Sequence, residues 1–150
     1  MTDLPEHVVI GGTTFSRVES DDSIACWASI LDDTRSVFLL VEPAAVPGPA
    51  QLRLAGTVVS RFGELAEVAA EYLRHRLREP RFDLPPAELS ALDAPEAPFS
   101  EPEAVVWADG TWLLRFTESS LLMADPFGVG VVFEGTTPRN VEDLSDADLA

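Results

Sequence analysis

The sequence predicts an α+β fold, in which an antiparallel sheet from an N-terminal and a C-terminal meander packs on one long central helix. Two patterns carry this prediction. Apolar residues recur at helical spacing between residues 50 and 79, whereas the segments 7–42 and 103–135 alternate with a period of two. Because the helical segment separates the two strand-forming regions, we expect it to lie across the apolar face of their sheet.

Length and composition predict a single domain over residues 1–150. A chain of this length with 46% hydrophobic residues can bury a core without disulfides or metals. The single cysteine excludes an internal disulfide, and no basic start followed by an apolar run marks a signal peptide. No apolar stretch is long enough to span a bilayer. The expected location is therefore the cytoplasm.

The N-terminal region 7–42 predicts three or four strands. Residues 7–10 and 13–18 flank Gly11-Gly12, which can adopt the positive φ angles of a tight hairpin. Residues 23–31 are apolar on both alternating faces, which favours a central strand. Residues 36–42 form a further apolar run that is rich in strand-forming residues.

The segment 50–79 predicts one amphipathic helix, preceded by a proline-rich connection at 43–49. Gly56 and Gly63 each weaken it by about 1 kcal/mol relative to alanine, so we expect residues 51–56 at its start to be less regular than the part from Thr57 onward. His75 falls on the solvent side. The expected buried stripe consists of Ala55, Val58, Val59, Phe62, Leu65, Ala66, Ala69, Tyr72, Leu73 and Leu77.

Residues 80–102 contain six prolines and predict a surface crossover, with one helical turn at 86–92 and anchors at Phe82 and Phe99. The hairpin region 103–135 follows. Its strands 103–107 and 111–117 flank Asp109-Gly110, a strong hairpin signal.

A further strand at 121–124, a turn at 125–128 and a last strand at 129–133 complete this region. Trp112, Leu114 and Phe116 share one face of the second strand, and Val129, Val131 and Phe133 form the inward face of the last one. Residues 136–150 read as an acidic tail, either loose or a short helical turn.

No residue pattern predicts catalysis, a cofactor or a metal. Cys26 lies within a strand of an acidic protein, which favours a buried, inert thiol. His7 and His75 lack the spacing of a metal site, and Gly11-Gly12 lacks the context of a phosphate-binding loop. Glu42 ends an apolar strand and is the acid with the best case for a functional role.

Net charge is the most unusual global feature. Twenty-six acidic residues face ten basic ones, all arginine, for a net charge of −16. This charge argues against nucleic acids and anionic membranes as partners and favours a basic protein. Residues 51–83 hold six arginines and five acids and carry a net +1, so the remainder carries −17. The acids thus belong to the turns, the crossover and the tail.

The pattern from Val105 to Phe116, followed by that from Asp125 to Phe133, resembles small bacterial α+β domains in which a W-x-x-x-F strand precedes a G-[apolar]-x-V-x-F strand. Domains of this kind occur among suspected immunity proteins of polymorphic toxin systems. The resemblance covers about 30 residues of core pattern. It implies a non-enzymatic protein that binds and blocks a toxin, and it transfers no site residues.

Two functional hypotheses follow. The first is a non-enzymatic acidic binding protein, an immunity-type inhibitor of a basic toxin, whose partner-binding residues are Glu142, Asp143, Asp146 and Asp148. The alternative is a generic interaction or self-assembly module without a toxin partner. An enzyme would need a pocket in which Glu42, His7 or Cys26 meets a second titratable group. The sequence does not determine the oligomeric state.

Overall fold

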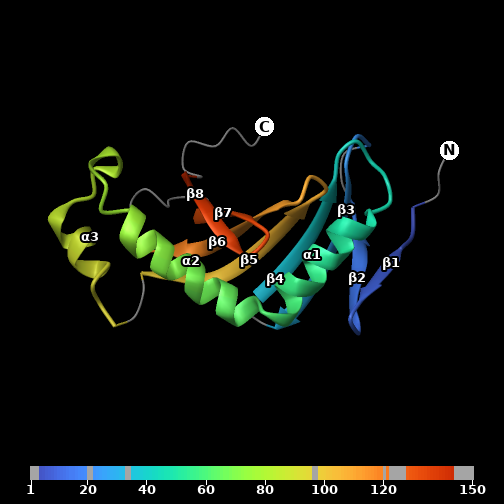
Figure 1. Ribbon diagram of the computed structural model, residues 1–150, viewed down its shortest axis with the longest axis horizontal. Coiled ribbons are helices and arrows are strands. Elements are labelled where there is room, and N and C mark those ends of the chain that lie inside the picture. The colour runs from blue at the N-terminus through green and yellow to red at the C-terminus, as the bar shows by residue number, and fades with distance from the viewer. Residues whose placement is uncertain are drawn as a thin grey trace.

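The computed structural model describes residues 4–19, 22–32, 35–95, 98–119, 121 and 128–143. Within these residues the chain forms one sheet of eight strands in the order β1-β2-β3-β4-β5-β6-β7-β8, with helices packed on it (Figure 1). The predicted α+β class is confirmed. Neighbouring strands are antiparallel except β4 and β5, which are parallel and join the two meanders into one sheet.

The N-terminal meander consists of β1 (His7–Ile10), β2 (Thr13–Val18), β3 (Ala25–Asp32) and β4 (Arg35–Val41). Gly11 and Gly12 have φ angles of 54° and 84°, so they make the left-handed turn that a two-residue hairpin requires. As expected from its two apolar faces, β3 is central and pairs with both β2 and β4.

The prediction of one long helix over 50–79 is wrong, because the segment forms α1 (Pro49–Ser60) and α2 (Phe62–Arg76). They meet at Arg61, whose φ of −115° departs from helical geometry. The hydroxyl groups of Thr57 and Ser60 donate to the carbonyl oxygens of Arg53 and Thr57, both at 3.2 Å. Such back-bonding bends helices. The junction lets α1 pack on β1, β4 and β5 while α2 follows β7 and β8.

The predicted buried stripe is confirmed along both helices. Ala55, Val58, Phe62, Leu65, Ala69, Leu73 and Leu77 are each at most 2% exposed. Val59, Ala66 and Tyr72 are half-buried against the same core, and His75 is exposed as expected.

The connection after α2 contains a short 3-10 turn (Pro80–Phe82) and the helix α3 (Pro86–Ala91), which confirms the predicted helical turn. Phe99 is 7% exposed and Phe82 packs against the core, as predicted. The crossover is nevertheless shorter than 80–102, since β5 (Phe99–Trp107) already begins at residue 99. Passing through the helices, the chain returns to the sheet in the direction of β4, which makes the β4–β5 pair parallel.

The C-terminal meander continues with β6 (Thr111–Ser119), β7 (Val129–Glu134) and β8 (Thr137–Asp143). The β5–β6 hairpin is confirmed, as is the last predicted strand. The expectation of an acidic tail from residue 136 is wrong for 137–143, because β8 pairs with β7 and buries Val141 opposite Val131. Residues 122–127 and 144–150, and with them most of the predicted strand 121–124 and turn 125–128, lie outside the described residues.

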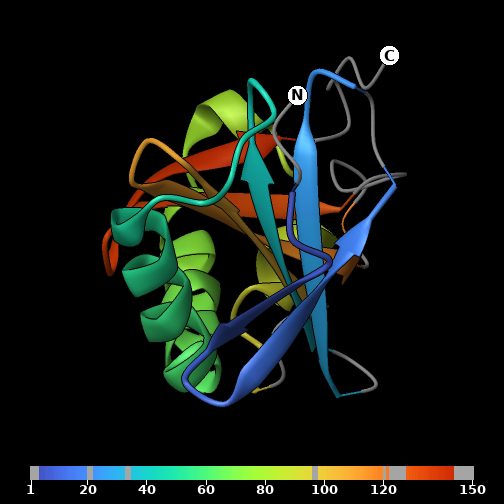
Figure 2. The same ribbon diagram turned by 90° about the vertical axis from the view of Figure 1, so that its right-hand side faces the viewer.

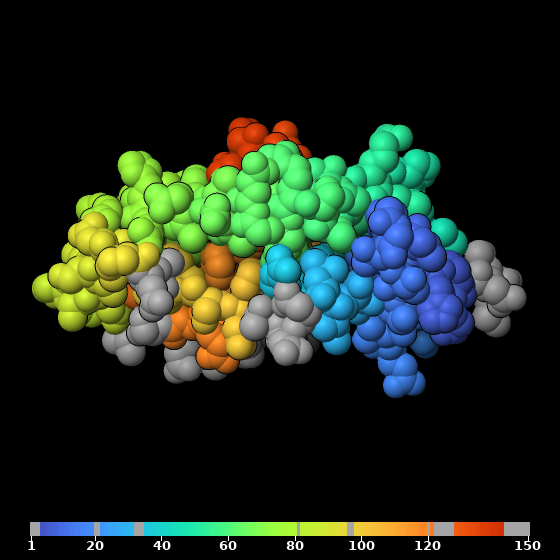
Figure 3. Space-filling view, turned by 90° about the horizontal axis from the view of Figure 1, so that it is seen from below, coloured from blue at the N-terminus to red at the C-terminus, as the bar shows by residue number. Residues whose placement is uncertain are grey.

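The two faces of the sheet differ in what covers them. Both α1 and α2 lie on one face, here called the inner face (Figures 1 and 2). Together they form a ridge along the length of the molecule, with the β1–β2 hairpin near one end and α3 at the other (Figure 3). The helices and the inner face share one core cluster that includes Trp27, Trp112 and Phe133. Among the described residues, no helix is long and apolar enough to cross a membrane.

Candidate functional site

The thiol of Cys26 lies within β3 and is buried, as the sequence predicts. Its side chain is 8% exposed, and burial raises its pKa above the ordinary value. The thiolate is the reactive form of cysteine, so a raised pKa opposes reactivity near neutral pH.

The other sequence candidates for chemistry lie apart. His7 is on the edge strand β1, where its Nδ1 lies 3.4 Å from the hydroxyl oxygen of Ser16. His75 lies on α2, and Glu42 is exposed just after β4. Among the described residues, no group of three or more His, Cys, Asp or Glu side chains could hold a metal ion. His7, His75 and Glu42 thus lie outside β3, the strand that carries Cys26.

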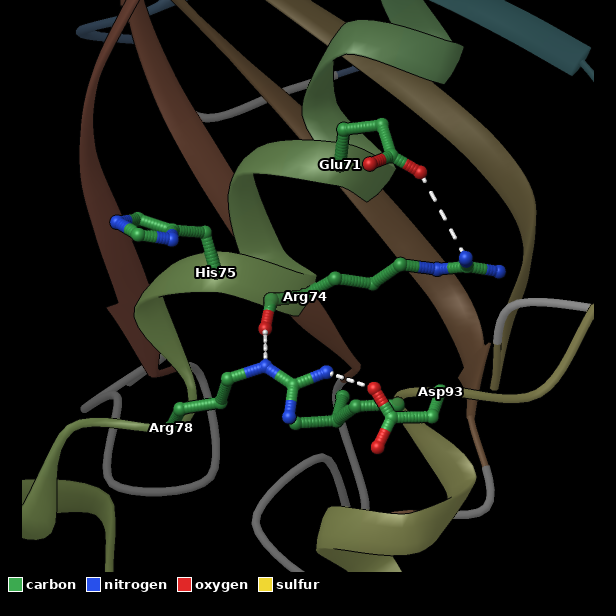
Figure 4. A pocket seen from close by; sticks show the side chains of 6 residues that line it. Glu71, Arg74, His75, Arg78 and Asp93 are labelled. Atoms are coloured by element: carbon green, nitrogen blue, oxygen red, sulfur yellow. Dashed lines mark hydrogen bonds and ion pairs between the residues drawn. The ribbon is translucent and has the colours of Figure 1, made fainter.

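A pocket of about 310 Å³ lies between the C-terminal half of α2 and the turn that follows α3 (Figure 4). A second pocket of about 370 Å³ adjoins it and shares Glu71 and Arg74. The lining of the first pocket consists of Glu71, Arg74, His75, Arg78, Leu92 and Asp93. Sequence reasoning placed His75 on the solvent side of the helix and missed the pocket, because Leu92 and Asp93 are distant in the chain from α2.

The charged groups of this pocket bind one another and the backbone. Arg74 donates to the carbonyl oxygens of Ala94 at 3.0 Å and Pro95 at 3.4 Å, and its guanidinium lies 3.6 Å from the carboxylate of Glu71. Arg78 donates to the carbonyl oxygen of Arg74 at 2.9 Å and pairs with Asp93. Figure 4 shows the imidazole of His75 pointing away from these groups. This arrangement fastens the turn at 92–95 to α2.

Acidic residues gather at the end of the sheet where β6 and β8 end and β5 and β7 begin. Glu101, Glu118 and Glu142 are exposed there, and Asp143 is the last residue of β8. Glu103 lies nearby and pairs with Arg115 at 3.2 Å.

The structure thus places two of the four predicted partner-binding residues, Glu142 and Asp143, on a strand instead of a tail. Asp146 and Asp148 lie outside the described residues.

The second face of the sheet, here called the outer face, is apolar. The strand registers align Ala28, Phe38, Val105, Leu113 and Val132 in one row across β3–β7. They align Val18, Cys26, Leu40 and Trp107 in a neighbouring row across β2–β5.

None of these nine side chains belongs to the core cluster or packs against it. They therefore form a separate apolar surface on the side of the sheet opposite α1 and α2.

Sequence reasoning found only part of the outer face. It recognised two apolar faces for residues 23–31 but not for the later strands. The signal was present in 36–41, 104–107 and 111–116, where apolar residues occupy both alternating positions. Such runs are typical of strands covered on both faces. The sequence could not supply the register between strands that aligns these apolar residues.

Comparisons with known proteins add no relative to this description. No protein-family model matches the chain, and the searches of curated proteins and of solved structures found no match.

Proposed function

We propose that this protein is a non-enzymatic binding protein whose partner is a basic protein. The observation that carries the proposal is the separation of charge along the chain: residues 51–83 have a net charge of +1 and the remainder −17. Three exposed glutamates at one end of the sheet, at positions 101, 118 and 142, contribute to this excess. A surface of one sign steers a partner of the opposite sign and accelerates association.

Binding without catalysis is the better hypothesis for the described residues. The Cys26 thiol is buried, the two histidines lie on different elements, and the charged groups of the α2 pocket are engaged with one another. A catalytic site needs a nucleophile or base within hydrogen-bond reach of a second group.

An immunity-type inhibitor of a basic bacterial toxin is the specific form of this proposal. The resemblance of the C-terminal strands to immunity proteins suggests it, and the acidity fits a toxin with a basic nucleic-acid-binding cleft. Such an inhibitor would occupy the cleft in place of the nucleic acid.

Co-purification from the native host tests the proposal. We expect a basic partner that is released by raising the salt concentration, because salt screens exposed charges. Reversal of Glu142 and Asp143 to arginine should weaken this capture more than reversal of Glu67, an exposed glutamate on α2. Recovery of a monomer without a partner, together with no rescue of cells that express the neighbouring toxin gene, would contradict the proposal.

A self-assembly module is the second candidate, and the apolar outer face favours it. The two edge strands of the sheet, β1 and β8, do not favour self-assembly by strand pairing. β1 has only four residues, and β8 contains Pro138 and exposes most of its polar side chains. Short edges, proline and charge are features that oppose edge-to-edge pairing. Light scattering over a range of protein concentrations distinguishes a dimer from a monomer.

A further inference from the structure

We propose that the outer face of the sheet is the docking surface for a protein segment with an apolar centre and a basic rim. The inference rests on the proposed function and names the surface and the partner chemistry. Two observations support it: the contiguous apolar rows on this face, and the sign of the charges around them.

The apolar rows are large enough for the centre of an interface. They extend over β2–β7, and five strand spacings of about 4.8 Å give a width of about 24 Å. Cys26 and Leu113 are buried, at 8% exposure each, so the accessible part of the rows comes from the half-buried side chains. These are Ala28, Phe38, Leu40, Val105, Trp107 and Val132.

Val18 is 38% exposed at the margin of the rows, and Val9 (67%) and Ile30 (79%) project from the same face beside them. Large contiguous apolar patches on a protein surface mark interaction sites.

The rim of the outer face is acidic. The registers place Glu103, Arg115, Gly130 and Glu142 in the row beside the apolar ones, and Glu134 opposite Thr111 on the same face. Arg115 lies in that row and already pairs with Glu103. The registers of β1 with β2 and of β2 with β3 place His7 on the same face, at the β1 edge. Over β5–β8 the described residues so placed are therefore three carboxylates and one guanidinium.

The charge selects the occupant. In a dimer of this chain, the acidic rims of the two copies would face each other, and each copy would carry a net charge of −16. Like charges placed opposite each other at an interface repel and weaken association. A segment with apolar side chains at its centre and arginine or lysine around them fits both features, and specific interfaces have this anatomy of apolar core and polar rim.

A defined peptide tests the proposal. The probe is a synthetic amphipathic helix of about 14 residues, with a leucine stripe flanked by arginines. Its control has the same composition in an order that destroys the stripe. Trp107 is the reporter, because the other two tryptophans, Trp27 and Trp112, are 0% exposed on the inner face. We expect the amphipathic peptide to shift the tryptophan fluorescence and to bind at least about tenfold more tightly than its control.

Two matched pairs of variants locate the contact. Val132→Ser and Glu142→Arg change the outer face, whereas Val46→Ser changes an exposed loop valine and Glu67→Arg an exposed glutamate on α2. We expect the first pair to weaken peptide binding about tenfold and the second pair to leave it within about twofold. Urea unfolding of each variant shows that it is folded, and Glu142 is exposed, so its reversal tests the face even if Val132→Ser does not fold.

The outcomes separate the two proposals. The amphipathic peptide and its control could bind equally tightly, with an affinity that falls as salt is added. That result would overturn the outer face as the docking surface and leave acidic recognition intact. Binding of neither peptide would overturn the outer face as the docking surface, whereas the proposal of a basic partner is decided by the co-purification. A dimer in the absence of peptide that Val132→Ser converts to a monomer would assign the face to a second copy and overturn this inference.

Discussion

At the scale of single residues, Gln51 is the buried polar side chain with the most consequence for the fold. It is 1% exposed, and its amide nitrogen donates to the carbonyl oxygens of Leu40 at 3.1 Å and Val106 at 3.0 Å. These carbonyls belong to β4 and β5, so the side chain of α1 joins the two strands of the parallel pair. Its Oε1 has no hydrogen-bond partner.

We expect Gln51→Leu to destabilise the protein by about 2 kcal/mol, because it leaves two buried carbonyl oxygens without this donor. Gln51→Glu should destabilise it more at pH 8 than at pH 5, since a carboxylate would face those two oxygens. Urea unfolding at both pH values measures the effects. Equal stability of Gln51→Leu and the wild type would show that the bridge between β4 and β5 is dispensable.

Asp109 shows how a turn residue acquires a shifted titration. Its Oδ1 accepts hydrogen bonds from the hydroxyl group of Thr111 at 2.6 Å and from the backbone N–H of the same residue at 3.0 Å. These bonds favour the charged carboxylate and lower its pKa, the hydroxyl group having the larger effect. The stability this gives is present above the unfolded pKa and is lost as the pH falls through the lower, folded value.

We expect Thr111→Val to raise the pKa of Asp109 toward its ordinary value by removing the hydroxyl donor. Titration of the carboxyl carbon by NMR measures the shift directly. Ser100→Ala, which changes a hydroxyl on β5 outside this turn, should leave the titration unchanged. An unaltered pKa in Thr111→Val would assign the shift to the backbone bond alone.

At the scale of elements, α1 and α2 show how one apolar pattern gives two helices. The stripe continues through Arg61, and backbone bonds from Arg61 N–H to the Thr57 carbonyl (3.0 Å) and from Leu65 N–H to the Arg61 carbonyl (2.9 Å) lie on either side of the junction. The change in the direction of the helix axis between α1 and α2 therefore leaves the same side chains facing the sheet. The spacing of apolar residues shows which face of a helix is buried, but it does not show such a bend.

The surroundings of the two helical glycines predict that alanine is tolerated better at Gly63 than at Gly56. A Cβ at Gly63 would have no neighbour closer than the Arg35 side chain at 4.0 Å, whereas a Cβ at Gly56 would lie 3.2 Å from the Cγ2 of Ile10 on β1. Alanine gains about 1 kcal/mol of helix propensity over glycine. We expect Gly63→Ala to raise the free energy of unfolding by up to that amount and Gly56→Ala to give less. Thermal and urea unfolding of both variants decide the ranking, and a larger gain for Gly56→Ala would reverse it.

At the scale of the whole molecule, the net charge of −16 opposes the compact state through self-repulsion. We expect the midpoint of thermal unfolding to rise when sodium chloride is raised from about 20 mM to about 300 mM, because the Debye length then falls below the spacing of most exposed charges. A fall of the midpoint would mean that exposed ion pairs, such as Arg61–Glu64 at the start of α2, outweigh the repulsion. Sodium sulfate is unsuitable here, since it also strengthens apolar burial.

Local patterns determined the elements and most of their buried faces. The alternation of Trp112, Leu114 and Phe116 set the inner face of β6, and the flanked Asp109-Gly110 pair set its hairpin, because both depend on residues close in the chain. The strand at 137–143 escaped prediction because, among its residues 137–142, Val141 alone is buried. Its pairing with β7 supplies the stability that its own sequence does not indicate.

Only the tertiary structure decided what lies side by side across long distances in the chain. The parallel pairing of β4 with β5 aligns Phe38 with Val105 and Leu40 with Trp107 and so completes the outer face. The position of the turn at 92–95 against α2 likewise depends on Arg74 and Arg78, whose partners Ala94 and Asp93 lie 20 and 15 positions away in the chain. Periodicity is a property of one segment, whereas register and docking depend on which segments meet. The sequence alone therefore determined an acidic α+β protein, and the fold determined where its two apolar faces and its acidic rim lie.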